Sequence, residues 1–313
     1  MEHLDFTPTP IIQLPYYSNK WGCNVVAKRD DLFAQAGGGS KARMLQYILY
    51  PLVRDNTEVL VTAGGPCSNY NRAAALLCAH YGIQLELISY TDEPKEWESL
   101  NHKIVKMAGA HLTFCKKDNV PTTIEQVVES VSKSGKRFSH LYGGGRQLEG
   151  FYAYYDAVKE LREQSSTDFD EVFVACGTGT TLTGICAGMH KFFPNAIVHA
   201  ISNARLWNAE KSIIEDDMKI LNDYLGTSYD FSNMRFHEEF LAGGYAKTCD
   251  AELSTIRECI SNTGMLVDPT YSGKAFWGMS EIISKENSGN KNILFWNTGG
   301  QMNLMTQINE FGN

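Results

Sequence analysis

An apolar segment of this chain runs directly into a loop rich in glycine and threonine, and then into a helical pattern. The apolar part, Val172–Ala175, is followed by Gly177-Thr178-Gly179-Thr180-Thr181 and by a helix-like stretch from Leu182 to Phe192. Short apolar runs of this kind are typical of strands buried in a parallel sheet. The segment therefore favours an α/β fold.

The same alternation of strand and helix signals continues along the chain. Strands are predicted at Asn24–Lys28, Val59–Ala63, Gln84–Ser89, His111–Phe114, Val172–Ala175, Ile197–Ile201 and Ile293–Trp296, with helices between them, for example Leu148–Gln164 and Asp250–Asn262. No internal repeat or low-complexity linker interrupts the pattern. It predicts parallel-type twisted sheets covered by helices, in which ligands bind at the ends of the strands.

The loop at residues 177–181 has the features of an anion site. Free N–H groups at a helix N-terminus point outward, the helix dipole adds positive potential, and threonine hydroxyls can donate further hydrogen bonds. No lysine follows Gly179 as a Walker motif requires, and the spacing of a dinucleotide fingerprint is absent. A lone phosphate group is the expected ligand. The alternative is a glycine-rich turn that binds nothing.

A second glycine run, Gly37-Gly38-Gly39-Ser40, ends in Lys41, which opens a helix-like segment extending to Val53. Glycines let the backbone bend and approach a ligand closely. A lysine held at such a loop–helix junction can condense with an aldehyde and later move protons. Taken alone, the run could also be a flexible surface loop with a solvated lysine.

A third junction links the predicted strand at residues 59–63 to a helix predicted over Asn71–His80. Between them lies Gly64-Gly65-Pro66-Cys67-Ser68-Asn69. Ser68 and Asn69 stand where the helix would begin, so their side chains could cap it. They could also bind a carboxylate or a ring hydroxyl there.

Composition limits the partners of the chain. Its 313 residues are enough for two domains that share a cleft. The net charge is −8 without a long basic run, so nucleic acid is not an expected partner. No apolar stretch approaches the roughly 18 residues of a membrane span, and the N-terminus lacks a signal-peptide pattern. A cytoplasmic protein without a membrane partner is expected.

The titratable residues that remain suggest no metal site. Eight cysteines are scattered without zinc-ligand spacing, and they are interpreted as reduced thiols, with Cys78, Cys186 and Cys259 in the core. Cys67 and Cys176 lie instead in the candidate ligand loops. The acidic run at residues 215–217 is interpreted as a solvated helix face.

These segments together resemble the pyridoxal-phosphate (PLP) enzymes of the tryptophan-synthase β-chain fold (fold type II). Within that fold they are most similar to the family of D-cysteine desulfhydrase and 1-aminocyclopropane-1-carboxylate (ACC) deaminase. The family patterns K-R-[DE]-D, G-G-N-K-x-R-K-L-E, Q-S-N-[HQ]-x-R, D-P-V-Y-x-G-K and H-[TL]-G-G correspond here to Lys28-Arg29-Asp30-Asp31, Gly38-Gly39-Ser40-Lys41-Ala42-Arg43-Met44-Leu45-Gln46, Cys67-Ser68-Asn69-Tyr70-Asn71-Arg72, Asp268-Pro269-Thr270-Tyr271-Ser272-Gly273-Lys274 and Asn297-Thr298-Gly299-Gly300. Thr7-Pro8-Thr9-Pro10 matches the family's entry motif, so the matches keep their order from residue 7 to residue 300.

The resemblance implies a two-domain enzyme that acts as a homodimer. Residues 1–47 plus 161–313 would form the large cofactor-binding domain and residues 48–160 a small inserted one, with PLP in the cleft between them. Lys41 would carry the cofactor, and its phosphate would lie on Gly177, Thr178, Gly179, Thr180 and Thr181. Asn69 would contact the ring hydroxyl, and Thr298 would face the ring nitrogen.

The resemblance also implies which residues meet a small amino-acid substrate. They are Cys67, Ser68, Asn69, Tyr70, Tyr245 and Tyr271, and the catalytic residues among the implied set are Lys41, Ser68 and Tyr271. The loop Gly143-Gly144-Gly145 would lie near the cofactor face. Aromatic packing would explain Tyr245 and Tyr271 as well, and flexibility would explain the three glycines.

Among the positions that depart from the family patterns are Ser40, Cys67, Tyr70 and Asn297. All four are expected to lie close to the cofactor or the substrate. The ACC deaminases carry a tyrosine four residues before the late Gly-Gly, where this chain has Phe295. On this interpretation, ring opening is disfavoured.

The expected function is α,β-elimination from a small amino acid, as in D-cysteine desulfhydrase, giving pyruvate, ammonia and the released β-group. The alternatives are β-replacement, ring opening of the ACC deaminase kind, and a non-catalytic PLP-binding protein. The intact Lys41 argues against the last of these.

Overall fold

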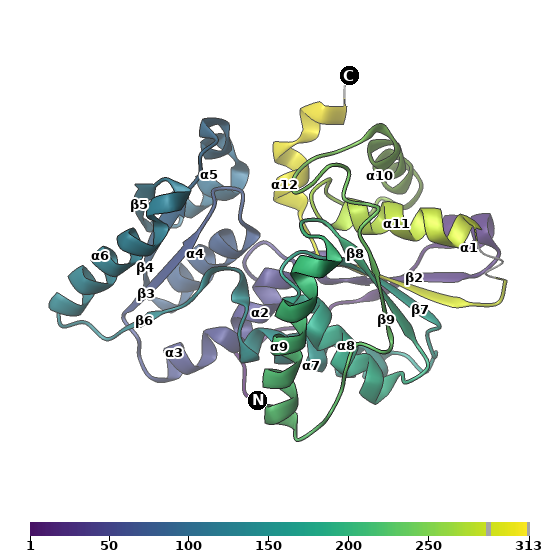
Figure 1. Cartoon of the computed structure of the whole chain (residues 1–313), viewed down its shortest axis with the longest axis horizontal. Helices are drawn as coiled ribbons and strands as arrows, with labels where there is room; N and C mark the ends of the chain where they lie inside the picture. Colours follow the sequence, from purple (N-terminus) through teal and green to yellow (C-terminus); the bar gives the residue numbers. More distant parts are fainter. Residues whose placement is uncertain (286–288, 312–313) are drawn as a thin grey trace.

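The computed structural model describes residues 1–285 and 289–311, and these contain two sheets. A six-stranded sheet has the strand order β1-β2-β10-β7-β8-β9, and a four-stranded sheet has the order β5-β4-β3-β6. The two sheets lie in separate halves of the molecule, each flanked by helices (Figure 1).

The six-stranded sheet is built from β1 (Ile11–Gln13), β2 (Asn24–Arg29), β7 (Glu171–Cys176), β8 (Ile197–Ser202), β9 (Met234–His237) and β10 (Asn292–Asn297). The four-stranded sheet is built from β3 (Val59–Gly64), β4 (Gln84–Tyr90), β5 (His111–Cys115) and β6 (Phe138–His140). Neighbouring strands run parallel except for β1, which pairs antiparallel with β2. The predicted α/β fold is therefore confirmed.

The helices are α1 (Pro15–Trp21), α2 (Ser40–Ile48), α3 (Tyr50–Arg54), α4 (Asn69–Tyr81), α5 (Leu100–Met107), α6 (Val120–Lys133), α7 (Leu148–Gln164), α8 (Thr180–Phe192), α9 (Trp207–Leu225), α10 (Asp250–Thr263), α11 (Ser272–Lys285) and α12 (Gln301–Thr306). Single 3₁₀ turns occur at η1 (Asp30–Leu32), η2 (Pro94–Glu98), η3 (Lys117–Asn119), η4 (Gly143–Gly145) and η5 (Ile308–Phe311). None of the described helices is long and apolar enough to cross a membrane.

Two sequence predictions about helices need correction. The continuous helical segment expected over residues 41–53 is divided into α2 and α3 at Leu49. Pro51 lacks the N–H that would continue the α2 hydrogen-bond ladder. The acidic run on α9 is only partly solvated, because Asp217 is buried and forms an ion pair with Arg146 at 2.8 Å.

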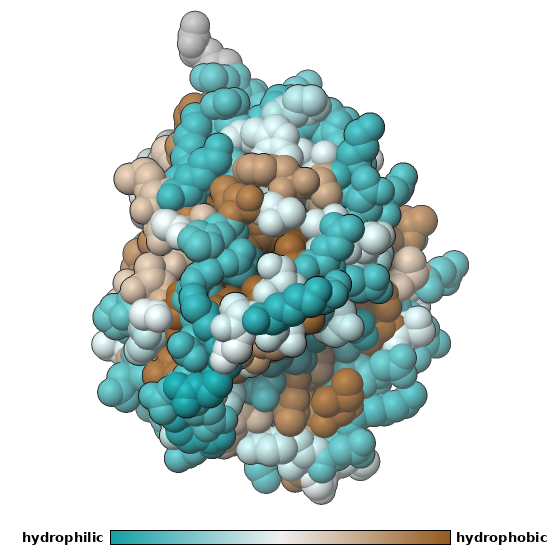
Figure 2. Space-filling view, turned by 90° about the vertical axis from the view of Figure 1, so that its left-hand side faces the viewer, coloured by the Kyte–Doolittle hydropathy of each residue, from teal (hydrophilic) through white to brown (hydrophobic). Residues whose placement is uncertain are grey.

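The predicted domain boundaries remain a proposal. The four-stranded sheet spans residues 59–140, inside the proposed small domain. Helix α7, however, packs against α8 and α2, on the side of the six-stranded sheet (Figure 1). This packing favours ending the inserted domain before α7, at the η4 turn. The outer face of the four-stranded half mixes polar side chains with apolar ones (Figure 2).

A buried charged cluster joins β2 to the helices beneath it. The guanidinium of Arg43 in α2 donates to Asp30 at 2.9 Å and to Glu160 of α7 at 2.8 Å. Tyr154 and Trp296 donate to the second oxygen of Asp30, at 2.8 and 2.9 Å. Burial alone would raise the pKa of Asp30, but Arg43 and Lys28 lower it to about 2. The cluster therefore links β2, α2, α7 and β10.

We expect Asp30→Asn to lower the free energy of unfolding by about 3–5 kcal/mol, because it leaves the charge of Arg43 without one of its buried partners. The folded pKa of Asp30, about 2, lies below its ordinary value of 3.8. The contribution of the ionised Asp30 carboxylate to the free energy of unfolding is therefore complete above pH 3.8, and it is lost as the pH falls through 2. Urea unfolding at neutral pH measures the loss. The exposed pair Arg54–Asp55 supplies the control, since Asp55→Asn should leave the midpoint unchanged. Equal effects of the two substitutions would contradict the role given to the cluster.

Candidate active site

A cavity of about 660 Å³ lies between the two sheets, at the ends of β3 and β7. Its lining comes from the start of α2 (Ser40 and Lys41), residues 63–65 and 67–70, residues 142–144, residues 175–182, Tyr245, Tyr271 and residues 298–300. Every residue to which the sequence analysis gave a catalytic, cofactor-binding or substrate-binding role lies on this lining, although the individual roles stay predictions. Segments far apart in the sequence thus meet at one place.

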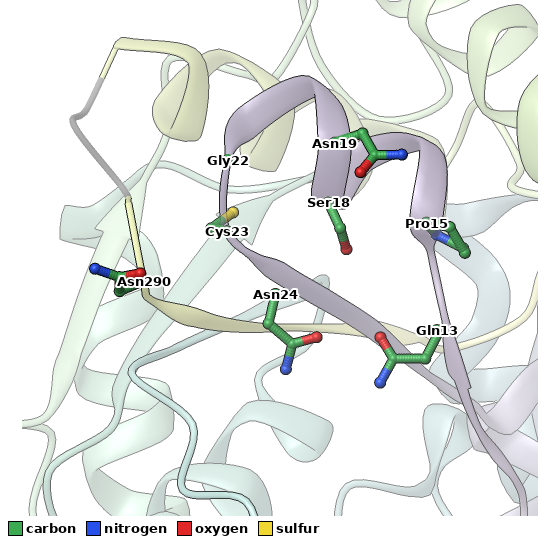
Figure 3. A pocket seen from close by; sticks show the side chains of 8 residues that line it. All are labelled: Gln13, Pro15, Ser18, Asn19, Gly22, Cys23, Asn24 and Asn290. Atoms are coloured by element: carbon green, nitrogen blue, oxygen red, sulfur yellow. The ribbon is translucent and has the colours of Figure 1, made fainter.

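A second hollow, of about 520 Å³, lies beside α1 and the start of β2 (Figure 3). Its lining residues are Gln13, Pro15, Ser18, Asn19, Gly22, Cys23, Asn24 and Asn290. Of these residues, only Cys23 is titratable, and its side chain is buried. The hollow therefore offers no set of groups for acid–base or nucleophilic chemistry, and the cavity between the sheets is the candidate site.

Two glycine runs meet behind Lys41. The N–H of Ser40 donates to the carbonyl oxygen of Thr298 at 2.8 Å. A Cβ on Gly299 would lie 2.7 Å from the Cα of Gly39, and both residues have positive φ, 97° and 89°. Side chains at either position would push the two loops apart. The glycines are therefore required for close packing, and this packing fixes the start of α2.

Lys41 is the second residue of α2 and extends into the cavity. Its Nζ donates to the carbonyl oxygen of Gly144 at 2.7 Å and lies 3.7 Å from the sulfur of Met44. Burial lowers its pKa to about 8. A substantial fraction of the amine is thus neutral near pH 7–8, as an attack on an aldehyde requires. The predicted glycine loop at residues 143–145 supplies its hydrogen-bond acceptor.

The loop after β7 has the geometry expected of an anion site. Gly179 is the N-cap of α8 with φ 78°, and the N–H groups of the first helical turn lack partners within the helix. The hydroxyls of Thr178 and Thr180 lie 3.2 Å apart. A Cβ on Gly179 would come within 2.3 Å of Ile214 in α9, so this glycine also allows α9 to pack closely.

Ser68 and Asn69 have structural partners as well as a place on the cavity wall. The Ser68 hydroxyl accepts from the N–H of Asn71 at 3.2 Å and caps α4, which confirms the capping alternative. The side-chain oxygen of Asn69 accepts from Arg72 at 2.8 Å and from Asn101 at 3.1 Å. These bonds hold both side chains at the cavity, so capping and ligand binding are compatible.

Tyr245 and Tyr271 form a hydrogen-bonded pair on the cavity wall. Their hydroxyl oxygens are 2.6 Å apart. Burial raises the pKa of Tyr245 to about 12, and it raises that of Tyr271 well above its ordinary value. Both phenols therefore stay protonated at neutral pH, which makes them possible proton donors and excludes them as resting bases.

Two residues behind this pair were quoted in a motif but given no role by the sequence analysis. Buried Asp268 accepts hydrogen bonds from the backbone N–H groups of Thr270, Tyr271 and Ser272, and burial raises its pKa to about 6. Buried Lys274 donates to the carbonyl oxygens of residues 241 and 244 at 2.7 Å each, in the loop that carries Tyr245. The two charged groups thus hold the backbone segments of both tyrosines. Their burial and contacts are not visible in the sequence.

Two interpretations of the late motif were wrong. Phe295 has no exposed surface and packs edge-on against Phe276, with ring centroids 5.0 Å apart, so it does not reach the cavity. Asn297 is also buried, and its side chain bonds to the backbone of Leu266 and Gly299. The other departures, Ser40, Cys67 and Tyr70, do line the cavity. Phe295 therefore gives no argument against ring opening.

Several further lining residues were not found from the sequence. They are Tyr90, Glu96, Lys117, Val120, Ile124, Tyr142, Ala204 and Arg205, and most of them come from the four-stranded half. Turns and helix ends of this kind carry no motif that marks them as part of a site.

Comparisons with known proteins agree with this geometry. A family model described as pyridoxal-phosphate dependent enzyme matches residues 3–299. A putative ACC deaminase of Thermotoga maritima is 28% identical over 97% of both chains. The bifunctional mitochondrial D-cysteine desulfhydrase/ACC deaminase of Arabidopsis thaliana is 28% identical over 97% of this chain and 79% of its own.

Solved structures show the same likeness. The crystal structure of an ACC deaminase homologue aligns with a TM-score of 0.90 and 26% identity, over 99% of this chain and 95% of that one. Serine racemase from Dictyostelium discoideum aligns with a TM-score of 0.68 at 16% identity, over 94% of this chain and 93% of that one, which shows the shared fold. The chain belongs to the family of PLP-dependent enzymes, and its cofactor is pyridoxal 5′-phosphate.

We expect capture of PLP by the cofactor-free protein to accelerate as the pH rises through about 8, because only the neutral Lys41 amine attacks the aldehyde. Rapid-mixing absorbance at a series of pH values measures the rate. The phosphate, ring hydroxyl and ring nitrogen of PLP titrate as well, so Nα-acetyl-lysine serves as the control amine, and its profile should continue to rise toward the ordinary lysine pKa of 10.5. A protein profile that follows the control would contradict a lowered pKa at Lys41.

Proposed function

We propose that this enzyme is a lyase or deaminase that removes a β-substituent from a small amino acid by α,β-elimination. The products would be pyruvate, ammonia and the released group, as the name D-cysteine desulfhydrase of the Arabidopsis relative suggests. One observation carries the proposal: a lysine amine of lowered pKa and a pair of protonated phenols line the same cavity. Elimination needs a base at Cα, and a poor leaving group also needs an acid that protonates it as it departs.

The cofactor would be held by three parts of the cavity. Lys41 would bond to it, residues 177–181 would hold its phosphate, and the amide of Asn69 would donate to its ring oxygen. Thr298, whose backbone already fixes Ser40, would face the ring nitrogen. When bound, PLP supplies an electron sink for the bond broken at Cα. These assignments are supported by the cavity position of every residue named.

Lys41, when its amine is free, would act as the base at Cα of the bound substrate. Its lowered pKa leaves it partly neutral at physiological pH, and its contact with the Gly144 carbonyl gives the freed amine a defined position. Brønsted behaviour favours a base whose pKa lies near the working pH. Lys41 would therefore remove the proton from Cα and keep it until product leaves.

Tyr271 would donate a proton to the departing β-group. Its hydroxyl is held by Tyr245, and the raised pKa of both phenols keeps the proton available. A Cβ on Gly177 would lie 3.7 Å from the ring of Tyr271, so the phenol stands beside the proposed phosphate loop. Tyr245 would then return a proton to Tyr271.

The substrate carboxylate would lie at the N-terminus of α4, against Ser68. The helix dipole and the free N–H groups of the first turn favour an anion there. The neighbouring Cys67 is a small side chain on the cavity wall, and burial raises the pKa of its thiol. A neutral thiol leaves room for the side chain of the substrate without a competing charge.

Ring opening of ACC is the second candidate function. Relatives from Thermotoga maritima and Arabidopsis thaliana carry ACC deaminase in their names. Buried Phe295 no longer argues against this reaction, because it does not contact the cavity. Ring opening yields a four-carbon keto acid and elimination from cysteine or serine yields pyruvate, so the products separate the two candidates.

We also propose a cytoplasmic homodimer. All eight cysteines are free, which supports a reducing compartment, although the Arabidopsis relative is mitochondrial. The dimer rests on the family resemblance alone, and light scattering on the purified protein tests it.

We expect Lys41→Ala to abolish the visible absorbance of the lysine-bound cofactor and to reduce turnover at least about 1000-fold, because both the covalent bond and the proposed base are lost. The spectrum of the PLP-loaded protein and assays of keto-acid release measure both effects. Lys117→Ala is a suitable control, since Lys117 also lines the cavity but lies at its exposed rim. Wild-type turnover by Lys41→Ala would overturn the assignment.

We expect Tyr271→Phe to lower kcat about 100-fold for D- or L-serine, whose hydroxide leaves poorly, and far less for β-chloroalanine, whose chloride needs no proton. The matched variant Tyr245→Phe removes the hydrogen bond to Tyr271 and keeps the proposed acid, so its effect should be smaller. Kinetics on D- and L-cysteine, D- and L-serine, β-chloroalanine and ACC complete the panel. Equal losses for all leaving groups would contradict an acid role, and ACC turnover as fast as the best amino acid would favour ring opening.

A further inference from the structure

Arg72, in the first turn of α4, is a buried arginine that lacks a carboxylate partner in the described part of the chain. Its Nε and one terminal nitrogen donate to the carbonyl oxygens of Ala36 and Gly38, at 3.2 and 2.8 Å. The other terminal nitrogen donates to the side-chain oxygens of Asn69 and Asn101, at 2.8 and 3.1 Å. All four acceptors are neutral. Burial lowers the pKa of Arg72 to about 10, so the group stays charged at neutral pH.

These contacts fix the orientation of the Asn69 side chain. Its oxygen accepts two hydrogen bonds, from Arg72 and from Asn101, and an oxygen has two lone pairs to offer. Both partners donate, so the oxygen must face them and the NH₂ group must point the other way. Asn69 lies on the cavity wall. Its two N–H donors are therefore presented to the cavity.

The same guanidinium connects two of the loops that form the site. It bonds to the backbone of the glycine run that precedes Lys41, and a Cβ on Gly37 would lie 3.3 Å from its Nε. In the sequence of α4, Arg72 follows Ser68 and Asn69 by about one helical turn. The Arg72 side chain thus connects Lys41, which would carry the cofactor, to Asn69, whose amide would donate to the cofactor ring. It thereby sets the distance between these two residues.

We propose that Arg72 is a positioning residue for the cofactor, acting through Asn69. It holds the amide as a hydrogen-bond donor toward the cofactor ring oxygen and polarises it, since a charged donor on the amide oxygen strengthens the N–H groups of the same amide. Through that amide, the negative charge of the ring oxygen would balance the buried positive charge of Arg72, for which the described residues provide no carboxylate partner. The inference rests on the proposed contact between Asn69 and the ring oxygen.

A double-mutant cycle on cofactor affinity tests this role. In the Asn69 wild-type background, Arg72→Gln should raise the Kd for PLP about tenfold or more, the worth of a hydrogen bond to a charged group. In the Asn69→Ala background the same substitution should change Kd less than about twofold. Titration of cofactor-free protein followed by absorbance gives Kd without any assay of turnover. Arg146→Gln is the control, because Arg146 also anchors a cavity loop but pairs with Asp217, so its effect should be the same in both backgrounds.

Asn69→Asp provides a test in which stability and affinity move in opposite directions. The new carboxylate gives Arg72 the missing partner, so the thermal unfolding midpoint of the cofactor-free protein should rise. It also removes the N–H donors and repels the ring oxygen, so Kd should rise as well. A helix N-terminus stabilises any new carboxylate. The increase must therefore be compared with Asn69→Asp in an Arg72→Gln background, where most of it should disappear.

These measurements distinguish a failure of the role proposed for Arg72 from a failure of the proposed contact between Asn69 and the cofactor. If Asn69→Ala leaves Kd unchanged, Asn69 does not contact the cofactor, and both the assignment and the inference fall. If Asn69→Ala weakens binding but Arg72→Gln has the same effect in both backgrounds, only the role of Arg72 is overturned. If Arg72→Gln does not fold, Asn101→Ala, which removes the second donor to Asn69, and Asn69→Asp decide the matter. No loss of affinity in Asn101→Ala together with no stability gain in Asn69→Asp would refute the inference.

Discussion

The position of the proposed catalytic lysine depends on the buried ion pair between Asp30 and Arg43. Asp30 directly follows β2 as the first residue of η1, and Arg43 lies two residues after Lys41 in α2. Tyr154 and Trp296 bond to the same carboxylate, so α7 and β10 are fixed to it as well. Removing one partner would leave a buried charge unpaired, which costs far more than losing a surface pair. The ion pair therefore fixes the first turn of α2, and the amine of Lys41 in the same turn faces the cavity.

Closely packed backbone segments form another wall of the site. Glycines at 39 and 299 let two loops pack at a distance that no Cβ would permit, and a Cβ on Gly300 would come within 2.1 Å of the carboxylate of Asp268. Asp268 in turn binds the backbone that carries Tyr271. The lysine, Thr298 and the tyrosine pair are thus connected by one continuous set of contacts. A change in any of these glycines would shift groups that belong to different steps of the proposed reaction.

Much of the fold could be predicted from the sequence, because strands buried on both faces appear as apolar β-branched runs. Each predicted strand was confirmed to within one residue at either end. The short strands β1, β6 and β9 were missed, since three or four residues carry no periodicity. The errors at Phe295 and Asn297 have a common cause. Alternate residues of a strand share a face, and both side chains lie on the face of β10 that carries Ile293 and packs into the core around α11. The cavity begins only where the strand ends, at Thr298.

An acidic protein can hold an anionic cofactor when local groups, and not net charge, determine the potential. The chain has a net charge of −8, yet of the described residues that line the cavity only Glu96 carries a carboxylate. The other contributions have the opposite sign: the amine of Lys41, the N-termini of α4 and α8, and the guanidinium of Arg72 behind Asn69. Carboxylates that stabilise the fold, such as Asp30 and Glu160, are instead neutralised by Arg43 and Lys28. Basic groups and helix N-termini thus outnumber carboxylates on the cavity wall itself. Burial in the same cavity favours the neutral form of the Lys41 amine over the charged form, so the cavity that would hold the phosphate also activates the amine.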